Sequence, residues 1–290
     1  MYFALDSCDP ALVHARVAER VAQRPDLHWM ALVDGAFDFG AKQQLAIGER
    51  FPIFNFGNMF EMMSASPFLV NLGTGDNLRR DIFTLARHRA ERPMLSFIGS
   101  RSPLPQVRQH LQQFVEVKEE DGQEFILRFA DTRILASLPE CLSPVAWAGL
   151  RCPAEEWLYV DRHGNLAAAA LPKDGSDAPL PLTLSHAEVA LLVEKGEPDA
   201  VINVLAGDHI ELLPLADRAL FYGRIAGICG FARRHQVDAF PDVVALAVFF
   251  LATGTDPAAD EGVLALMRSR QWESGRLIDR LSELVDDDVE

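Results

Sequence analysis

The sequence predicts an α/β (α+β) N-terminal lobe with a mixed sheet, followed by an all-α C-terminal lobe. Helix and strand signals alternate over residues 1–171, which favours a sheet with helices packed against it. Residues 172–181 contain three prolines, one glycine and two aspartates, a composition typical of a linker. Only helical signals follow in residues 182–290. We therefore expect a boundary between two lobes at this linker.

The N-terminal lobe begins with a helix, because Asp9 is a favourable N-cap and Pro10 fits the first helical position. Residues 38–60 are rich in phenylalanine and glycine and predict a packed irregular loop. Short apolar runs between turn residues predict strands, and Asp-Gly after Glu120 indicates a hairpin. We expect strands at 29–33, 67–72 and 94–98, helices at 77–90 and 105–114, and hairpins joining 115–118 to 124–129 and 157–160 to 166–171.

The C-terminal lobe begins with a helix capped by Ser185, and Glu188 completes a capping box. Residues 243–252 form the longest apolar stretch, which is far shorter than the roughly 20 residues that span a bilayer and predicts a buried helix. The start of the chain lacks a basic export signal, so we expect a cytoplasmic protein. Further helices are expected at 198–205, 215–235, 240–253, 258–269 and 275–285.

The charge of the chain is strongly acidic, with 27 Lys and Arg against 42 Asp and Glu and a net charge of −15. Such a surface repels nucleic acid and anionic membranes, so we expect neither as a partner. Residues 1–150 carry a net charge of −3, whereas residues 151–290 carry −12. The acidic second half indicates either a solubilising surface or one that attracts a basic partner.

Motifs for catalysis and cofactor binding are weak throughout the sequence. The eight histidines are dispersed and the four cysteines form no C-x-x-C motif, so we expect reduced thiols and neither a metal nor another cofactor. We expect no catalytic residue either. The loop Gly73–Asp76 follows a strand and precedes a helix, but position 78 is Leu where a dinucleotide-binding loop needs a third glycine. The alternative function is an anion- or nucleotide-binding α/β enzyme that uses this loop and Arg101 near the ends of parallel strands.

An unusual group of charges lies in the apolar segment 125–135, which contains Arg128, Asp131 and Arg133. Burying a charge is costly unless it is paired and hydrogen-bonded. We therefore expect Asp131 to cap the following helix and to accept a hydrogen bond from Arg128 or Arg133. This arrangement predicts a structural latch.

Residues 131–135 read D-T-R-I-L and resemble the D-P-R-V-L signature of the type VI secretion effector chaperones, also called adaptor proteins. Three further motifs resemble that family in the same order: A-L-V-D-G-A at 31–36, S-P-F-L-V at 66–70, and the helix at 100–111. The resemblance covers about residues 28–140. The sequence departs from the family at Thr132, where proline is usual. This difference concerns the first residues of the helix that follows Asp131. Asp34 joins Arg128, Asp131 and Arg133 in the expected structural motif.

The resemblance implies a non-enzymatic cytoplasmic adaptor of Gram-negative bacteria, which binds a toxic effector and helps to load it onto the VgrG spike. The expected partners are therefore a cognate effector and VgrG, and no cofactor is implied. A purely structural interaction module without a role in secretion is a third hypothesis. Aromatic residues are common anchors at interfaces, and acidic residues attract basic surfaces. The candidate partner-binding residues in the helical lobe are Phe221, Tyr222, Phe240, Phe249, Phe250, Trp272, Glu261 and Glu273.

Overall fold

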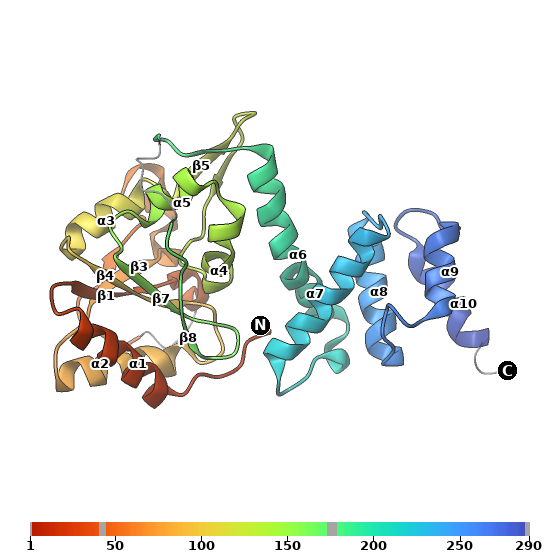
Figure 1. The fold of residues 1–290 in the computed structure, drawn as a ribbon, viewed down its shortest axis with the longest axis horizontal. Helices are drawn as coiled ribbons and strands as arrows, with labels where there is room; N and C mark the ends of the chain where they lie inside the picture. The colour runs from red at the N-terminus through yellow and green to blue at the C-terminus, as the bar shows by residue number, and fades with distance from the viewer. Residues whose placement is uncertain (1, 41–44, 173–178, 288–290) are drawn as a thin grey trace. The chain divides into compact units, whose positions relative to one another are not determined.

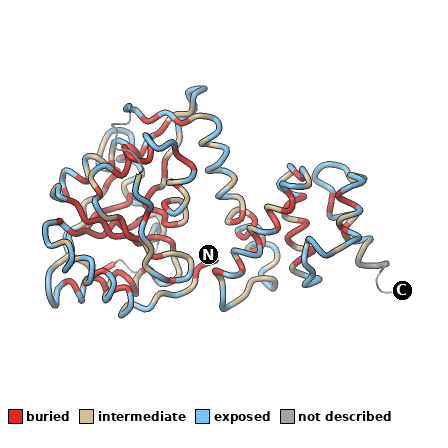
Figure 2. Tube along the Cα trace, viewed as in Figure 1, coloured by how far each residue is buried: buried red, intermediate tan, exposed pale blue. Residues whose placement is uncertain are grey.

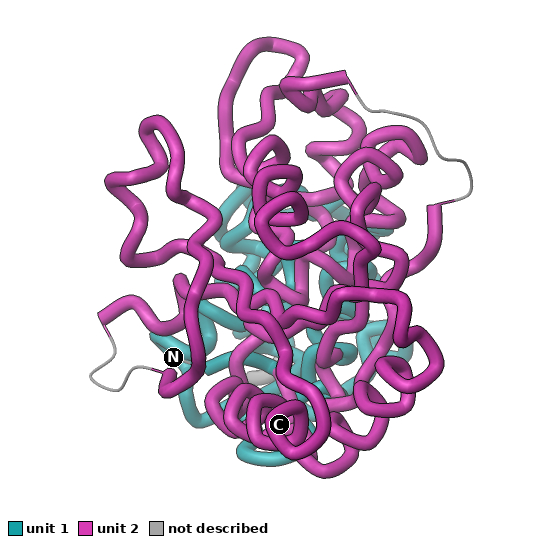
Figure 3. Tube along the Cα trace, turned by 90° about the vertical axis from the view of Figure 1, so that its left-hand side faces the viewer, with its two compact units in different colours: residues 1–4, 196–290 teal, residues 5–195 magenta. Residues whose placement is uncertain are grey.

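The computed structural model describes residues 2–40, 45–172 and 179–287, and the chain divides into two compact units (Figure 3). The first, which we call the α/β unit, spans Leu5–Lys195. The second, the helical unit, combines Met1–Ala4 with Gly196–Glu290. The predicted fold class is confirmed, because sheets and helices form the first unit and helices form the second.

A six-stranded sheet, sheet A, forms the centre of the α/β unit (Figure 1). Every neighbouring pair of its strands is antiparallel, and on the central strand Ala31 lies opposite both Val70 and Phe97. In spatial order the strands are β2 (Phe51–Pro52), β3 (Phe68–Asn71), β1 (His28–Val33), β4 (Leu95–Ser100), β7 (Glu156–Val160) and β8 (Leu166–Ala168).

Helices cover both faces of sheet A, because its strands are apolar on both sides and alternate residues point to opposite faces. Ala31 and Phe97 pack in one core, whereas Met30 and Trp157 pack in the other. Figure 2 shows the inner strands as mainly buried, whereas the edge strands β2 and β8 are partly exposed. The first face carries α1 (Pro10–Gln23) and α2 (Asp76–Arg89), and the second carries α3 (Leu104–Gln112), α4 (Thr132–Cys141) and α5 (Pro144–Arg151).

A second, three-stranded sheet mixes both strand directions. Strand β5 (Glu116–Glu119) pairs antiparallel with β6 (Glu124–Ile126) and parallel with β9 (Thr183–Leu184). Leu182 and Leu184 are buried in the core of the α/β unit, so this unit continues beyond the predicted boundary at residue 171. Residues 173–178 of the predicted linker lie outside the described residues.

The helical unit consists of helices around its own core. Phe250 and Leu246 are fully buried in this core, and Ala4 also belongs to it. Its elements are the second half of α6 (His186–Asp208), η3 (Ile210–Leu212), α7 (Arg218–Arg234), α8 (Phe240–Thr253), α9 (Glu261–Ser269) and α10 (Leu277–Asp287).

The structure corrects the prediction of two separate helices after Ser185, because α6 runs without a break through Pro198. A proline inside a helix removes one backbone hydrogen bond, and packing at both ends of α6 compensates for this loss. Val189 and Leu192 pack on the core of the α/β unit, while Val201 is buried in the helical unit. The compact units therefore divide between Lys195 and Gly196, inside a helix, rather than at the predicted linker.

Several shorter elements also differ from the predictions. The irregular loop predicted at 38–60 is present over most of its described residues. It also contains the short strand β2, and the 3-10 helices η1 (Gly35–Asp38) and η2 (Gly57–Ala65) overlap its two ends. Helix α5 was not predicted, although Ser143 caps it by accepting from the backbone N–H of Ala146 at 3.3 Å. The predicted capping box is present, since Glu188 accepts from the backbone N–H of Ser185 at 2.8 Å.

In the described part of the chain no helix is long and apolar enough to cross a membrane.

Candidate functional site

A cluster of four charged residues, which we call the Asp–Arg brace, joins the end of β1 to the start of α4. Its members are Asp34, Arg128, Asp131 and Arg133. Asp34 directly follows β1, and its carboxylate accepts from the backbone N–H of Ala36 at 3.0 Å, which caps η1. The other oxygen, Oδ2, accepts from Nη2 of Arg128 at 2.8 Å. This bond connects residues that are 94 positions apart in the sequence.

Asp131 is the second carboxylate of the brace and the N-cap of α4, as its position before the helix predicts. Its Oδ1 accepts from both the backbone N–H and Nε of Arg133 at 3.0 Å. Its Oδ2 accepts from Nη2 of Arg133 at 2.7 Å, so the ion pair is bidentate, and Nη2 of Arg128 lies 3.7 Å away. Arg128 therefore lies between the two carboxylates and connects them.

Both carboxylates of the brace are almost completely buried, with side-chain exposures of 2% for Asp34 and 1% for Asp131. Burial raises the pKa of Asp34, and the charge and hydrogen bond of Arg128 oppose that rise. The guanidinium groups of Arg128 and Arg133 lie 5.2 and 5.7 Å from the ring centre of Phe37. Because each carboxylate is occupied by guanidinium and N–H donors, the arrangement suits a structural brace better than a general base.

A neighbouring ion cluster connects η1 to the end of α2. Nε2 of His88 lies 2.7 Å from Oδ2 of Asp38, and Nη1 of Arg92 donates to Oδ1 of Asp38 at 2.6 Å. Arg92 also donates to the carbonyl of Phe37 at 3.2 Å, the same residue that lies against the brace. Burial alone would raise the pKa of Asp38, but the hydrogen bond and charge of His88 and the charge of Arg92 outweigh it, so the pKa is lowered.

The lowered pKa of Asp38 predicts a dependence of stability on pH. Its carboxylate stabilises the folded state above the unfolded pKa of about 3.9, and this contribution disappears as the pH falls through the lower folded pKa. We expect the wild-type chain to exceed Asp38→Asn in free energy of unfolding at pH 5, and the difference to shrink toward pH 3. Urea unfolding at stepped pH measures this difference. A difference that stays constant over this range would contradict the role assigned to Asp38.

The first residue of the loop Gly73–Asp76 is held by contacts within the chain itself. The backbone N–H of Gly73 already donates to Oδ2 of Asp81 at 3.1 Å, so a carboxylate of the chain itself occupies this donor. A Cβ at Gly73 would lie 2.5 Å from Cβ of Asn77, which explains the glycine by close packing rather than by a ligand. The preceding strand has only antiparallel neighbours, not the parallel ones expected for the nucleotide-binding alternative.

Three of the six predicted aromatic anchors of the helical unit are buried. Phe221, Phe249 and Phe250 have exposures of 8%, 8% and 0% and belong to the core, because α7 and α8 pack these sides against each other. Tyr222 and Trp272 are half-buried, and Phe240 is 39% exposed. The two predicted acids, Glu261 and Glu273, are exposed.

Asp242, a buried structural carboxylate of the helical unit, was not identified from the sequence. Asp242 lies in the first turn of α8, where an acid is common at a solvated helix start, yet it is only 2% exposed. It accepts from Nε1 of Trp272 at 3.2 Å and from the backbone N–H groups of Gly275 and Leu277 at 2.9 Å. Asp242 thus fixes the turn that leads into α10. The three donors lie 30 to 35 positions away, so no local pattern indicates them.

Among the described residues, neither the thiols nor the metal-ligating side chains form a second centre. All four cysteines are free, and burial raises the pKa of Cys229 to about 12, which disfavours its thiolate. In residues 2–40, 45–172 and 179–287, no group of three or more His, Cys, Asp or Glu side chains is placed to hold a metal ion. The brace therefore remains the most developed polar constellation of the α/β unit.

Comparison with known protein families identifies a match within the α/β unit. Residues 29–148 match the model of a family described as "Domain of unknown function (DUF4123)", which is associated with effectors of type VI secretion. All four residues of the Asp–Arg brace lie within the matched segment. No curated protein and no solved structure matches the chain.

Proposed function

We propose that this chain, which matches an effector-associated family over residues 29–148, is a non-enzymatic type VI secretion effector chaperone. It binds a cognate effector in the cytoplasm and assists its loading onto the VgrG spike. The family match is the observation that carries the proposal. The buried brace supports it as part of a stable frame, because its two carboxylates bond to the guanidinium groups of Arg128 and Arg133.

The acidic surface of the helical unit supports a role in partner binding. Residues 196–290 contain 17 Asp and Glu against 8 Lys and Arg. Complementary charge accelerates the encounter of two proteins more than it changes the final affinity. Glu261 and Glu273 are exposed parts of this surface, and the exposed ring of Phe240 belongs to the same unit. We therefore assign the first encounter with a basic region of the effector to the helical unit.

Co-expression of the tagged chain with the proteins encoded by neighbouring effector and VgrG genes tests the proposal. We expect the effector to be retained on the tagged chain at moderate salt and to be more soluble than when it is expressed alone. If neither the effector nor VgrG is retained even at low salt, the proposal is wrong. A clear rise in melting temperature with a nucleotide or a phosphorylated metabolite would instead favour the enzyme alternative.

Charge reversal on the helical unit is expected to slow binding without unfolding the chain. For Glu261→Lys combined with Glu273→Lys, we expect the association rate with the effector to fall about threefold to tenfold at low salt. The change in melting temperature should be small, because both side chains are exposed and the ion pair of Glu261 with Arg268 is a surface pair.

The matched control for this experiment carries the same change of charge on the α/β unit. Glu49→Lys combined with Glu61→Lys alters two exposed acids there. Stopped-flow or biosensor association rates at several salt concentrations compare the two double variants. Equal rates for both would show that the overall charge, and not the helical unit, steers the effector.

A further inference from the structure

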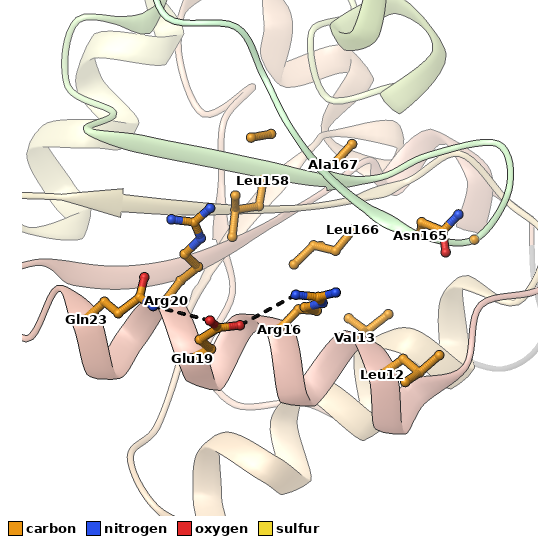
Figure 4. Close-up of a pocket in the computed structure, with 12 residues that line it drawn as sticks. Leu12, Val13, Arg16, Glu19, Arg20, Gln23, Leu158, Asn165, Leu166 and Ala167 are labelled. Carbon is orange, nitrogen blue, oxygen red and sulfur yellow. Dashed lines mark hydrogen bonds and ion pairs between the residues drawn. The ribbon is translucent and has the colours of Figure 1, made fainter.

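A groove in the α/β unit lies between α1 and the hairpin of β7 and β8. It has a volume of about 650 Å³. One wall is the exposed side of α1, which presents Leu12, Arg16 and Arg20, and the other wall includes Leu158 and Leu166. Figure 4 shows the side chain of Arg20 extending from α1 toward Leu158, and that of Arg16 beside Glu19. None of these residues belongs to the Asp–Arg brace, and the proposed function does not yet use them.

The floor of the groove ends at an edge of sheet A, because β8 is the last strand of this sheet among the described residues. The backbone N–H of Asp161 donates to the carbonyl of Asn165, and that of Ala169 donates to the carbonyl of Trp157, both at 2.8 Å. Along an antiparallel edge strand, the backbone N–H and C=O groups of successive residues point alternately toward the neighbouring strand and away from it. Leu166 and Ala168, which lie between these bonded positions, therefore direct their backbone N–H and C=O groups away from β7, toward the open edge.

The side chains of the groove add positive charge to this edge. The carboxylate of Glu19 lies 3.7 Å from Nη1 of Arg16 and accepts from Nε2 of Gln23 at 3.3 Å, so both of its oxygens have partners on α1. Arg20 is exposed and has no ion-pair partner in the described part of the chain. The groove thus presents two guanidinium groups and one carboxylate, in a chain whose net charge is −15.

We propose that this groove binds an extended acidic segment of the effector, which adds to β8 as a further strand; this inference rests on the proposed function. The N–H and C=O groups of Leu166 and Ala168 supply the main-chain hydrogen bonds. A carboxylate of the bound segment pairs with Arg20, and neighbouring apolar side chains of the segment pack on Leu12 and Leu166. The groove and the acidic helical unit then recognise segments of opposite charge.

Selection of a random dodecapeptide library on the full chain, followed by anisotropy measurements with labelled peptides, tests the inference. We expect the selected peptides to combine Asp or Glu with β-branched residues. Arg20→Glu and Ala168→Pro should each weaken binding about tenfold, by charge repulsion and by loss of one outward N–H. Proline is tolerated where the N–H of an edge strand points away from the sheet, and Arg20→Glu provides a surface variant that leaves β8 unchanged.

Arg79→Glu on α2 is the matched control, because Arg79 is exposed and lies outside the groove. It should leave the Kd unchanged. An absence of binding peptides, or peptides whose Kd is insensitive to both groove variants, overturns the inference. Retention of the effector by the wild-type chain and equally by both groove variants would overturn the groove but not the proposed function. If peptides bind in the groove but no effector is retained by the chain, the groove inference stands and the proposed function is wrong.

Discussion

Asp131→Ala is expected to lower the free energy of unfolding of the α/β unit by about 2–4 kcal/mol. The substitution removes the cap of α4 and the bidentate ion pair of Asp131 with Arg133, whose side chain is only 15% exposed. Arg128 also loses one of its two carboxylates, although its own exposure of 40% moderates the cost. Urea unfolding followed by tryptophan fluorescence suits this measurement, because Trp29, Trp147 and Trp157 all belong to the α/β unit.

Asp131→Asn separates the contributions of the cap and of the charge. Asparagine caps a helix about as well as aspartate, so this variant keeps the acceptor for the backbone N–H of Arg133 and loses only the ion pair. We expect its destabilisation to be smaller than that of Asp131→Ala by about 1 kcal/mol. An unfolding midpoint of Asp131→Ala equal to that of the wild type would mean that the brace does not support the fold, and the structural role assigned to it would be wrong.

Asp242→Ala is expected to destabilise the helical unit by about 2–4 kcal/mol, because each buried donor without an acceptor costs about 1–3 kcal/mol. Three donors depend on this carboxylate. The bond from the backbone N–H of Leu277 is buried, whereas Trp272 is half-buried and Gly275 is exposed, so water reaches these two donors more easily. Far-ultraviolet circular dichroism and the fluorescence of Trp272 report on this unit. Separate transitions for the two units would allow the effect to be assigned.

Asp279→Ala is the matched control for Asp242→Ala. Its carboxylate lies on α10 and accepts from Nε of Arg276 at 2.8 Å, but both side chains are exposed. A surface pair of this kind contributes about 0–1 kcal/mol. Equal destabilisation by the two variants would show that the buried hydrogen bonds of Asp242 do not organise the turn before α10.

Local signals were sufficient for much of the fold. Asp9 caps α1 by accepting from the backbone N–H of Ala11 at 2.8 Å, and the capping box of Ser185 and Glu188 is formed. Both expected hairpins are present, because their turn residues act within a few positions of the strands. These features depend on neighbours in the sequence, which is the information that a single sequence carries best.

Long-range pairing was the information that the sequence lacked. The parallel contact of β9 with β5 joins residues more than 60 positions apart, and nothing near Thr183 indicates it. The continuity of α6 through Pro198 depends on packing against two cores rather than on helix propensity. The division between the compact units could not be located from composition, because it lies inside a regular helix.

The candidate site shows the same difference between local and distant contacts. The pairing of Asp131 with Arg133 spans two positions and followed from the cost of burying charge in an apolar segment. No local spacing indicates the contact between Asp34 and Arg128, and the ion cluster of Asp38 with His88 was missed because its residues are 50 positions apart. For the aromatic anchors the sequence pattern was not sufficient, because it does not tell whether Phe249 and Phe250 face the core of the helical unit or solvent.

The most direct test of the chaperone role is effector secretion in a strain that lacks this chain. We predict that the cognate effector disappears from the medium while it is still synthesised, and that the wild-type chain restores its secretion. The groove variant Arg20→Glu and its control Arg79→Glu can be compared in the same assay. Undiminished secretion of the effector without the chain would contradict the chaperone role.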